Sequence, residues 1–259
     1  MDLGIRGRKA IVCASSQGLG RACAYALARE GAQVVVNGRD PAKLETTAAE
    51  IAKSTGAKVT PVVADLNVQA ERERLVASCP EADILVNNNA GPPPGRFEDW
   101  DHGDWLAALE ANLLAPAMMI RALLPGMKER GFGRIVNITS AMVKTPLAPM
   151  ALSTTARTGL TALCKSISKP AARHNVTINN LLPERIDTPR QEQMARIVMK
   201  LSAVSYEEAR QQQVDSIAAG RLGLPGEVGD ACAFLCSAQA GYISGQNLQL
   251  DGGSYDGLV

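Results

Sequence analysis

The 259-residue sequence predicts a single α/β domain built on a doubly wound parallel sheet of about seven strands, with helices on both faces. Two observations carry this prediction. Short runs of Val, Ile and Leu alternate with longer segments of helical periodicity along the whole chain. Most of the short runs are continuously apolar, as strands covered on both faces are. No linker or change of composition divides the chain, so we expect one domain over residues 1–259.

Each strand and helix follows from this alternation. The predicted strands are 9–14, 33–37, 58–63, 84–87, 134–139, 177–181 and 247–250. The predicted helices are 19–30, 41–54, 69–78, 104–130, 152–173 and 227–237. Asp40 is a good N-cap and Pro41 suits the first helical position, while Gly31 is expected to end the first helix. Parallel neighbours imply right-handed crossover connections.

Composition narrows the class of protein. Lys plus Arg number 27 and Asp plus Glu 26, and no basic block is present, which argues against a nucleic-acid partner. A hydrophobic share of 46% excludes general disorder. No apolar run approaches the roughly 20 residues of a membrane span, and the N-terminus lacks the order of a secretory signal. The six cysteines show neither a C-x-x-C pair nor zinc spacing. We therefore expect a cytoplasmic, metal-free protein that acts on a small molecule.

Two segments interrupt the alternation. Residues 91–95 contain three consecutive prolines and predict a stiff loop after the fourth strand. Residues 189–223 form a long insertion, for which we expect the role of a substrate lid; a solvated helical pair is the alternative. Its cations Arg190, Arg196 and Lys200 either attract an acid or face solvent.

The turns after the first three strands suggest a dinucleotide site. Residues 15–20 end in Gly-Leu-Gly, which lets a phosphate approach a helix N-terminus, although a simple tight turn is the alternative. Asn37 is the last residue of the second strand and Arg39 lies two residues further on, where NAD sites usually place a carboxylate; an arginine suits a 2′-phosphate. This favours NADP(H), with NAD as the alternative, unless Arg39 only pairs with Asp40. Asp65 is placed to accept an adenine amino group or to cap the next helix.

Over essentially its whole length the chain resembles the short-chain dehydrogenase/reductase family. The resemblance rests on the glycine turn, Asp65, D-I-L-V-N-N-N-A-G at 83–91, Asn112, the segment 134–140, N-V-T-I-N-N-L-L-P at 175–183 and S-G-Q-N-L-Q-L-D-G-G at 244–253. It implies a Rossmann-like NAD(P)-binding domain and a homo-oligomer, a tetramer or dimer packed through the predicted helices 104–130 and 152–173.

The resemblance also implies which residues meet the cofactor. They are Ser15, Ser16, Gln17, Gly18, Leu19, Gly20, Asn37, Arg39, Asp65, Leu66, Asn88, Asn89, Ala90, Arg157, Pro183, Ile186 and Thr188. Three positions depart from the family pattern. Cys13-Ala14 replaces Thr-Gly, the Asn-Asn-Ala-Gly motif can be aligned in two registers between 87 and 91, and Glu184 replaces a glycine.

The expected catalytic residues are Asn112, Ser140, Ser153 and Arg157. The first two match the family, whereas Ser153 and Arg157 stand where it has tyrosine and lysine. A serine hydroxyl is a far weaker acid than tyrosine, whose pKa is about 10, and arginine does not share its protons. Its charge can nevertheless stabilise an alkoxide.

The resemblance thus implies an NADP(H)-dependent oxidoreductase that interconverts a carbonyl and a secondary alcohol through an altered proton relay. Asn112 would anchor a relay water, Ser140 would bind the carbonyl and Arg157 would hold ribose. Tyr206 and Lys144 are alternative proton donors. The alternative function is a nucleotide-binding protein without redox turnover, as a sensor or an inactive oligomer partner.

Overall fold

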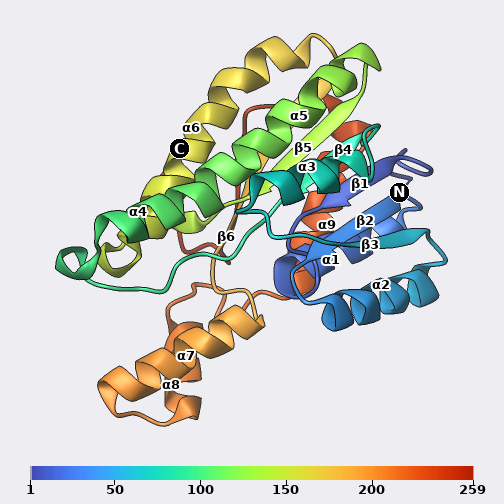
Figure 1. Ribbon diagram of the computed structural model, residues 1–259. Helices are drawn as coiled ribbons and strands as arrows, with labels where there is room; N and C mark the ends of the chain where they lie inside the picture. The colour runs from blue at the N-terminus through green and yellow to red at the C-terminus, as the bar shows by residue number, and fades with distance from the viewer. Residues whose placement is uncertain (1, 259) are drawn as a thin grey trace.

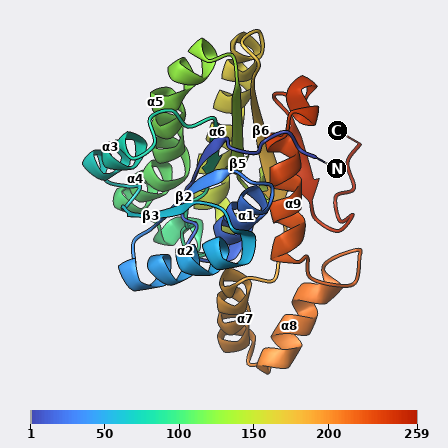
Figure 2. The same ribbon diagram turned by 90° about the vertical axis from the view of Figure 1, so that its right-hand side faces the viewer.

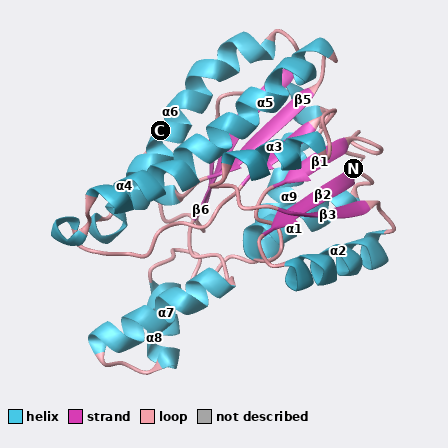
Figure 3. Cartoon of the chain, in the orientation of Figure 1, coloured by secondary structure: helices cyan, strands magenta, loops and turns pink. Residues whose placement is uncertain are grey.

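The computed structural model describes residues 2–258 and contains one seven-stranded, all-parallel sheet (Figures 1 and 3). The strand order is β3-β2-β1-β4-β5-β6-β7. The strands are β1 (Lys9–Val12), β2 (Gln33–Gly38), β3 (Val59–Val63), β4 (Ile84–Asn87), β5 (Gly133–Ile138), β6 (Val176–Pro183) and β7 (Asn247–Leu250). The predicted single-domain, doubly wound fold is confirmed. The order reverses between β1 and β4, and in such sheets ligands bind at the carboxyl ends beside that point.

Helices cover both faces of the sheet (Figure 2). One face packs against α1 (Gly18–Arg29), α2 (Pro41–Thr55) and α9 (Pro225–Cys236). The other packs against α3 (Gln69–Ala77), α5 (Ala115–Glu129) and α6 (Ala151–Ala172). Both faces of β1 are apolar because its side chains alternate between the two cores. Ala10 and Val12 pack in one core and Ile11 in the other.

The predicted helix 104–130 is interrupted. Residues 104–130 form α4 (His102–Leu109), a π-helical segment (Glu110–Leu114) and then α5, and Asn112 lies in the π-helical segment. An 18-residue window within His102–Glu129 has a mean hydropathy of 1.4, so this run is long and apolar enough to cross a membrane, which corrects the expectation that no such run exists. Met119 and Met127 nevertheless lie in the core against the sheet, and core helices pass the same test.

The insertion at 189–223 forms two helices, α7 (Pro189–Ser202) and α8 (Tyr206–Asp215), which pack against each other. Both lie apart from the two helical layers, beyond the carboxyl ends of the strands (Figures 1 and 2). Ser205 and Glu208 form a capping box at the start of α8, which explains why the helix begins there.

Four asparagine side chains form a hydrogen-bonded row across the middle of the sheet. The strand register places Asn87, Asn137, Asn180 and Asn247 side by side on β4, β5, β6 and β7. Each amide nitrogen donates to the next amide oxygen, at 2.9, 3.0 and 2.8 Å in turn. Because buried amides are stable only when hydrogen-bonded, the row fixes how the four strands sit against one another.

The six cysteines are buried and unpaired. Burial raises the pKa of both Cys13 and Cys164 to about 12, so these thiols are protonated at neutral pH. Among residues 2–258, no group of three or more His, Cys, Asp or Glu side chains could hold a metal ion.

Candidate active site

A cleft of about 800 Å³ opens at the carboxyl ends of the strands. Its walls are the turn after β1, the ends of β2, β3 and β4, the segment after β5, the end of β6 and the first turns of α7. The structure gathers there the following residues of the expected site: Ser16, Gln17, Gly18, Leu19, Asn37, Arg39, Asp65, Leu66, Asn88, Asn89, Ala90, Ser140, Ser153, Arg157, Pro183, Ile186 and Thr188.

Two expected cofactor residues lie behind the cleft wall. The Ser15 hydroxyl is buried, donates to the Val12 carbonyl at 2.7 Å and accepts from the main-chain N–H of Asn37 at 2.9 Å. Gly20 faces the backbone of the same turn, where a Cβ atom would come within 2.3 Å of the Ala14 carbonyl oxygen. Neither residue lines the cleft, and the Ser15 side chain and the missing Gly20 side chain shape the turn.

Asn37 lines the cleft, but its side-chain amide is engaged within the protein. Its side chain is buried, accepts from the Ala14 amide at 3.1 Å and donates to the carbonyls of Val62 and Ala64 at 3.2 and 3.0 Å. These bonds use its oxygen and both N–H groups, so Asn37 joins the turn after β1 to the end of β3.

Arg39 is free to meet a ligand, with 70% of its side chain exposed. Its nearest carboxylate is Asp65, at 3.8 Å, rather than Asp40. Asp40 instead caps α2 by accepting from the Lys43 amide at 3.1 Å. Asp65 does not cap α3, whose N-cap is Val68; its Oδ1 accepts from the Asn67 main-chain N–H at 2.9 Å, and its Oδ2 faces Arg39 at the same end of the cleft.

The turn at the start of α1 fits a phosphate group. Its N-cap, Gln17, makes no side-chain cap bond, and the first turn of the helix holds no acidic residue. The first backbone N–H groups of α1 therefore meet the cleft without a capping side chain, as an anion site requires. The Lys43 ammonium contacts the Gln17 side-chain oxygen. Sequence reasoning missed this second cation, since only the packing of α2 against α1 brings it to the turn.

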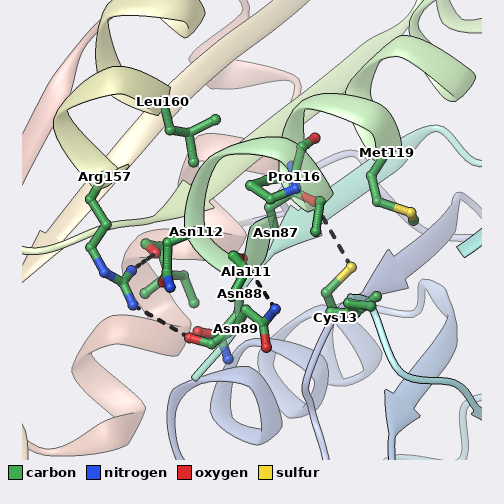
Figure 4. A pocket seen from close by; sticks show the side chains of 13 residues that line it. Cys13, Asn87, Asn88, Asn89, Ala111, Asn112, Pro116, Met119, Arg157 and Leu160 are labelled. Carbon is green, nitrogen blue, oxygen red and sulfur yellow. Dashed lines mark hydrogen bonds between the residues drawn. The ribbon is translucent and has the colours of Figure 1, made fainter. Parts of the chain in front are cut away.

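Ser153 and Arg157 lie one turn apart on α6 and are hydrogen-bonded to each other. Arg157 Nε donates to Ser153 Oγ at 3.1 Å. Main-chain carbonyls hold the rest of the guanidinium. Nη1 donates to Ile138 and Thr139 at 2.9 and 3.1 Å. Nη2 donates to Asn89 at 3.4 Å (Figure 4). The side chain is thus fixed against the ends of β4 and β5.

The charge of Arg157 has no counterion. Burial lowers the pKa of its guanidinium to about 10, and the positive charge of Arg190 adds to the effect. The group is therefore still cationic at neutral pH. No carboxylate among residues 2–258 forms an ion pair with it. This end of the cleft consequently favours a ligand atom that is, or becomes, negative.

Two serine hydroxyls face the same end of the cleft. Ser140 Oγ accepts from the Met142 amide at 3.2 Å, and Ser153 Oγ accepts from Arg157. Neither hydroxyl donates to an acceptor within residues 2–258. A serine that accepts through its oxygen still has its proton to donate, so both can bind a ligand oxygen.

Asn112 does not line the large cleft. It lies beside a second, much smaller pocket of about 20 Å³, which it shares with Arg157, Asn88 and Cys13 (Figure 4). The Asn112 amide nitrogen lies 3.4 Å from the Ala90 carbonyl oxygen, and its oxygen has no partner in the described chain. The cavity is large enough for one water molecule, which such an orphaned oxygen needs.

None of the four tyrosines lines the cleft. The Tyr206 ring packs on the Arg196 guanidinium, with the guanidinium carbon 5.1 Å from the ring centroid. Lys144 likewise lies outside the cleft wall, with its ammonium 4.8 Å from the centre of the Tyr255 ring. The geometry therefore does not support Tyr206 or Lys144 as the proton donor.

Comparisons with known proteins agree with this arrangement. A family model described as enoyl-(acyl carrier protein) reductase matches residues 13–255. Dehydrogenase/reductase SDR family member 4 of Bos taurus is 33% identical over 256 residues, 96% of this chain and 88% of the relative. This chain belongs to the short-chain dehydrogenase/reductase family.

Other members are similar over their full length. NADPH-dependent reductase BacG of Bacillus subtilis (strain 168) is 34% identical over 252 residues, which are 95% of this chain and 97% of BacG. The crystal structure of L-sorbose reductase from Gluconobacter frateurii, complexed with NADPH and L-sorbose, superposes with a TM-score of 0.94 at 28% identity and covers 100% of both chains. The short-chain dehydrogenase/reductase fold therefore extends over the whole chain.

Proposed function

We propose that this short-chain oxidoreductase is NADP(H)-dependent and interconverts a carbonyl and a secondary alcohol through a proton relay built on Ser153 and Arg157. The observation that carries the proposal is the 3.1 Å hydrogen bond from Arg157 Nε to Ser153 Oγ at the edge of the cleft. The family pattern leads one to expect tyrosine and lysine at these two positions. The cation keeps its place in that pattern, but the acid is an aliphatic hydroxyl.

The cleft suits NADP(H) along its length. The uncapped start of α1 would bind the phosphates, and exposed Arg39, with Lys43 nearby, would bind a 2′-phosphate. The Thr188 side chain lies close to Gly18 in the cleft, where it would also contact the cofactor. NADPH appears in the names of BacG and of the L-sorbose reductase complex, which supports NADP over NAD. When bound, the cofactor supplies or accepts the hydride.

The two serines would handle the substrate oxygen. In the reducing direction Ser140 and Ser153 donate hydrogen bonds to the carbonyl oxygen, and Ser153 passes its proton to that oxygen as an alkoxide forms. Arg157 Nε–H then stabilises the negative charge left on Ser153 Oγ. A water held by the Asn112 oxygen in the small pocket, which adjoins the cleft, would connect the relay to solvent. The same groups accept the proton when the alcohol is oxidised.

The remaining expectations extend the proposal. Residues 189–223 would act as the substrate lid, since Met194 and Val198 of α7 line the cleft. Leu114 and Met118 are exposed at the start of α5, and they would be covered in a dimer or tetramer packed through α5 and α6. We expect a cytoplasmic enzyme with a small-molecule substrate and with no nucleic-acid or membrane partner.

A nucleotide-binding protein without redox turnover is the second candidate. One observation favours it: none of the four tyrosines reaches the cleft, so the ordinary acid of the family is absent from it. Such a protein would bind NADPH and would leave every carbonyl compound unreduced.

The experiment that separates the two is a binding and turnover measurement on the purified protein. NADPH binding is followed by cofactor fluorescence, and NADPH oxidation is followed with a panel of ketones and aldehydes. We expect oxidation with at least one ketone and an approximately 100-fold lower kcat/KM for Ser140→Ala, as for loss of an oxyanion donor. Ser166→Ala, on the exposed side of α6, is the matched control. NADPH binding with no oxidation across the panel would instead establish the second candidate.

A further inference from the structure

Arg190 is a second cation, after Arg157, at the end of the cleft that holds Ser140 and Ser153. It follows Pro189 at the start of α7, lines the cleft and is half-buried. Its Nη2 donates to the Pro92 carbonyl at 2.8 Å, and its Nη1 donates to the Gln193 side-chain oxygen at 3.0 Å. Both partners are neutral. A guanidinium has five N–H groups, so the remaining ones lack a hydrogen-bond acceptor within residues 2–258.

The charges of Arg190 and Arg157 act on each other across this end of the cleft. Burial lowers the pKa of Arg190, and its charge contributes to the lowered pKa of Arg157. Neither guanidinium forms an ion pair with any carboxylate of the described chain. Two desolvated cations without a counterion are unfavourable by themselves. An anion bound between them would remove that penalty.

The two acidic residues that line the cleft do not supply this anion. Asp65 lies at the other end of the cleft, beside Arg39. Glu184 has Arg185 and Asp251 as its charged neighbours, and burial raises the pKa of its carboxyl. The counterion for Arg157 and Arg190 must therefore come from a ligand.

Arg190 is the cation of α7 whose side chain lines the cleft. Arg196 is exposed and packs on the Tyr206 ring, and Lys200 is exposed; neither lines the cleft. Met194 and Val198 on α7 form an apolar stretch of the cleft wall near Arg190, and Gln191 and Gln193 are the uncharged polar residues of the same helix that line it. The pocket thus offers one cationic end and an apolar wall next to the two serine hydroxyls.

We propose that Arg190, assisted by the charge of Arg157, binds a carboxylate of the substrate, so that the substrate is an oxo acid, or the matching hydroxy acid, on an apolar carbon skeleton. The guanidinium of Arg190 matches a carboxylate in shape, and its unpaired N–H groups can donate to both oxygens. This substrate class rests on the proposed carbonyl–alcohol activity, and it assigns to Arg190 the role of selecting acids over neutral carbonyl compounds.

The test compares matched substrates. The kcat/KM for NADPH oxidation is measured with aliphatic 2-oxo and 3-oxo acids and with their methyl esters. We expect the acids to be favoured at least about tenfold, because a charged hydrogen bond contributes roughly 1.5–3 kcal/mol. Arg190→Gln should bring the acid-to-ester ratio close to one, and Arg190→Lys should restore part of it. Arg196→Gln is the matched control and should keep the wild-type ratio. Equal turnover of acids and esters, unaffected by Arg190→Gln, overturns the inference.

A binding readout keeps this inference separate from the activity itself. The Kd of pentanoate, and of pentanamide, for the protein–NADPH complex is measured by calorimetry, with thermal melting to show that Arg190→Gln folds. The wild-type protein should bind pentanamide more weakly than pentanoate. We expect Arg190→Gln to raise the Kd of pentanoate at least about tenfold and to leave the Kd of pentanamide unchanged. If NADPH itself binds more weakly by the same factor, Arg190 serves the cofactor and the inference is overturned. Absence of any NADPH oxidation would overturn the proposed activity, while the pentanoate result would still decide the role of Arg190.

Discussion

Arg157 Nε donates a hydrogen bond to Ser153 Oγ across one turn of α6, and the same guanidinium donates to the main-chain carbonyls of Ile138, Thr139 and Asn89. The arginine is therefore anchored to the sheet before any ligand arrives. A cation held in this way needs no reorganisation when negative charge develops beside it, which is the basis of electrostatic preorganisation. The serine oxygen, unlike that of an isolated hydroxyl, is in direct contact with a positive charge.

Selectivity for the cofactor should depend on Arg39. Arg39→Ala removes an exposed guanidinium at the end of β2, so we expect the KM for NADPH to rise about 10- to 100-fold, from the loss of a charged hydrogen bond worth about 1.5–3 kcal/mol. The KM for NADH should change less than twofold. Arg21→Ala is the control, because Arg21 is an exposed arginine of α1 paired with Glu50. Steady-state kinetics with both cofactors measures the effect, and an equal rise in both KM values would contradict it.

The asparagine row should stabilise the sheet. Asn137→Ala leaves the Asn87 amide nitrogen and the Asn180 oxygen without their partner, so we expect a loss of about 2–4 kcal/mol in the free energy of unfolding. Urea unfolding followed by circular dichroism measures it.

Thr177 on β6 provides a control for the row. Its hydroxyl is buried and has no hydrogen-bond partner within the described residues. Thr177→Val removes an unsatisfied group and keeps the shape, so it should be neutral or stabilising by about 1 kcal/mol. If Thr177→Val lowers the free energy of unfolding as much as Asn137→Ala does, then any buried substitution in this sheet is destabilising and the asparagine row has no special role.

Glu184 should destabilise the protein at neutral pH. Burial raises the pKa of its carboxyl above the ordinary 4.5, so the folded state holds the proton more tightly than the unfolded state. Stability therefore falls as the pH rises from 4.5 through the raised pKa, and the penalty is fully present above it. We expect Glu184→Gln to raise the Tm at about pH 8 and to have little effect at about pH 4. Glu45→Gln, on the exposed face of α2, should show no such difference. An equal shift at both pH values would argue against a buried, charged Glu184.

The strands and layers could be predicted from the sequence because their signal is local. The apolar run 84–86 with Asn87 after it predicted β4 without error, and the Asp40–Pro41 pair marked the start of α2. The end of β1 was placed two residues late, since Cys13-Ala14 is apolar but Ala14 adopts a φ of +45° and turns the chain out of the sheet. The π-helical segment around Asn112 left no signal in the apolar periodicity.

The site was only partly predictable, because side-chain orientation depends on packing between distant segments. The spacing of Ser153 and Arg157 on one helix predicted that they share a face, and they are hydrogen-bonded. Asn37 was expected to meet the cofactor, but the neighbouring backbone of β3 turns its amide inward. Arg190 could not be separated from Arg196 by sequence, since only the position of α7 over the cleft directs one inward and the other to solvent.

The central claim is that the Ser153–Arg157 pair is a working proton relay. The most direct measurement is kcat for NADPH oxidation by the double variant Ser153→Tyr/Arg157→Lys, with the ketone that the wild-type protein reduces fastest. NADPH affinity and Tm are determined alongside, to show that the variant is folded and binds the cofactor. If the pair is a catalytic device in its own right, kcat should fall at least about tenfold, because the anchored cation and its bond to Oγ are lost. A large rise in kcat would contradict the account and would show that the native site is an impaired version of the ordinary tyrosine–lysine reductase.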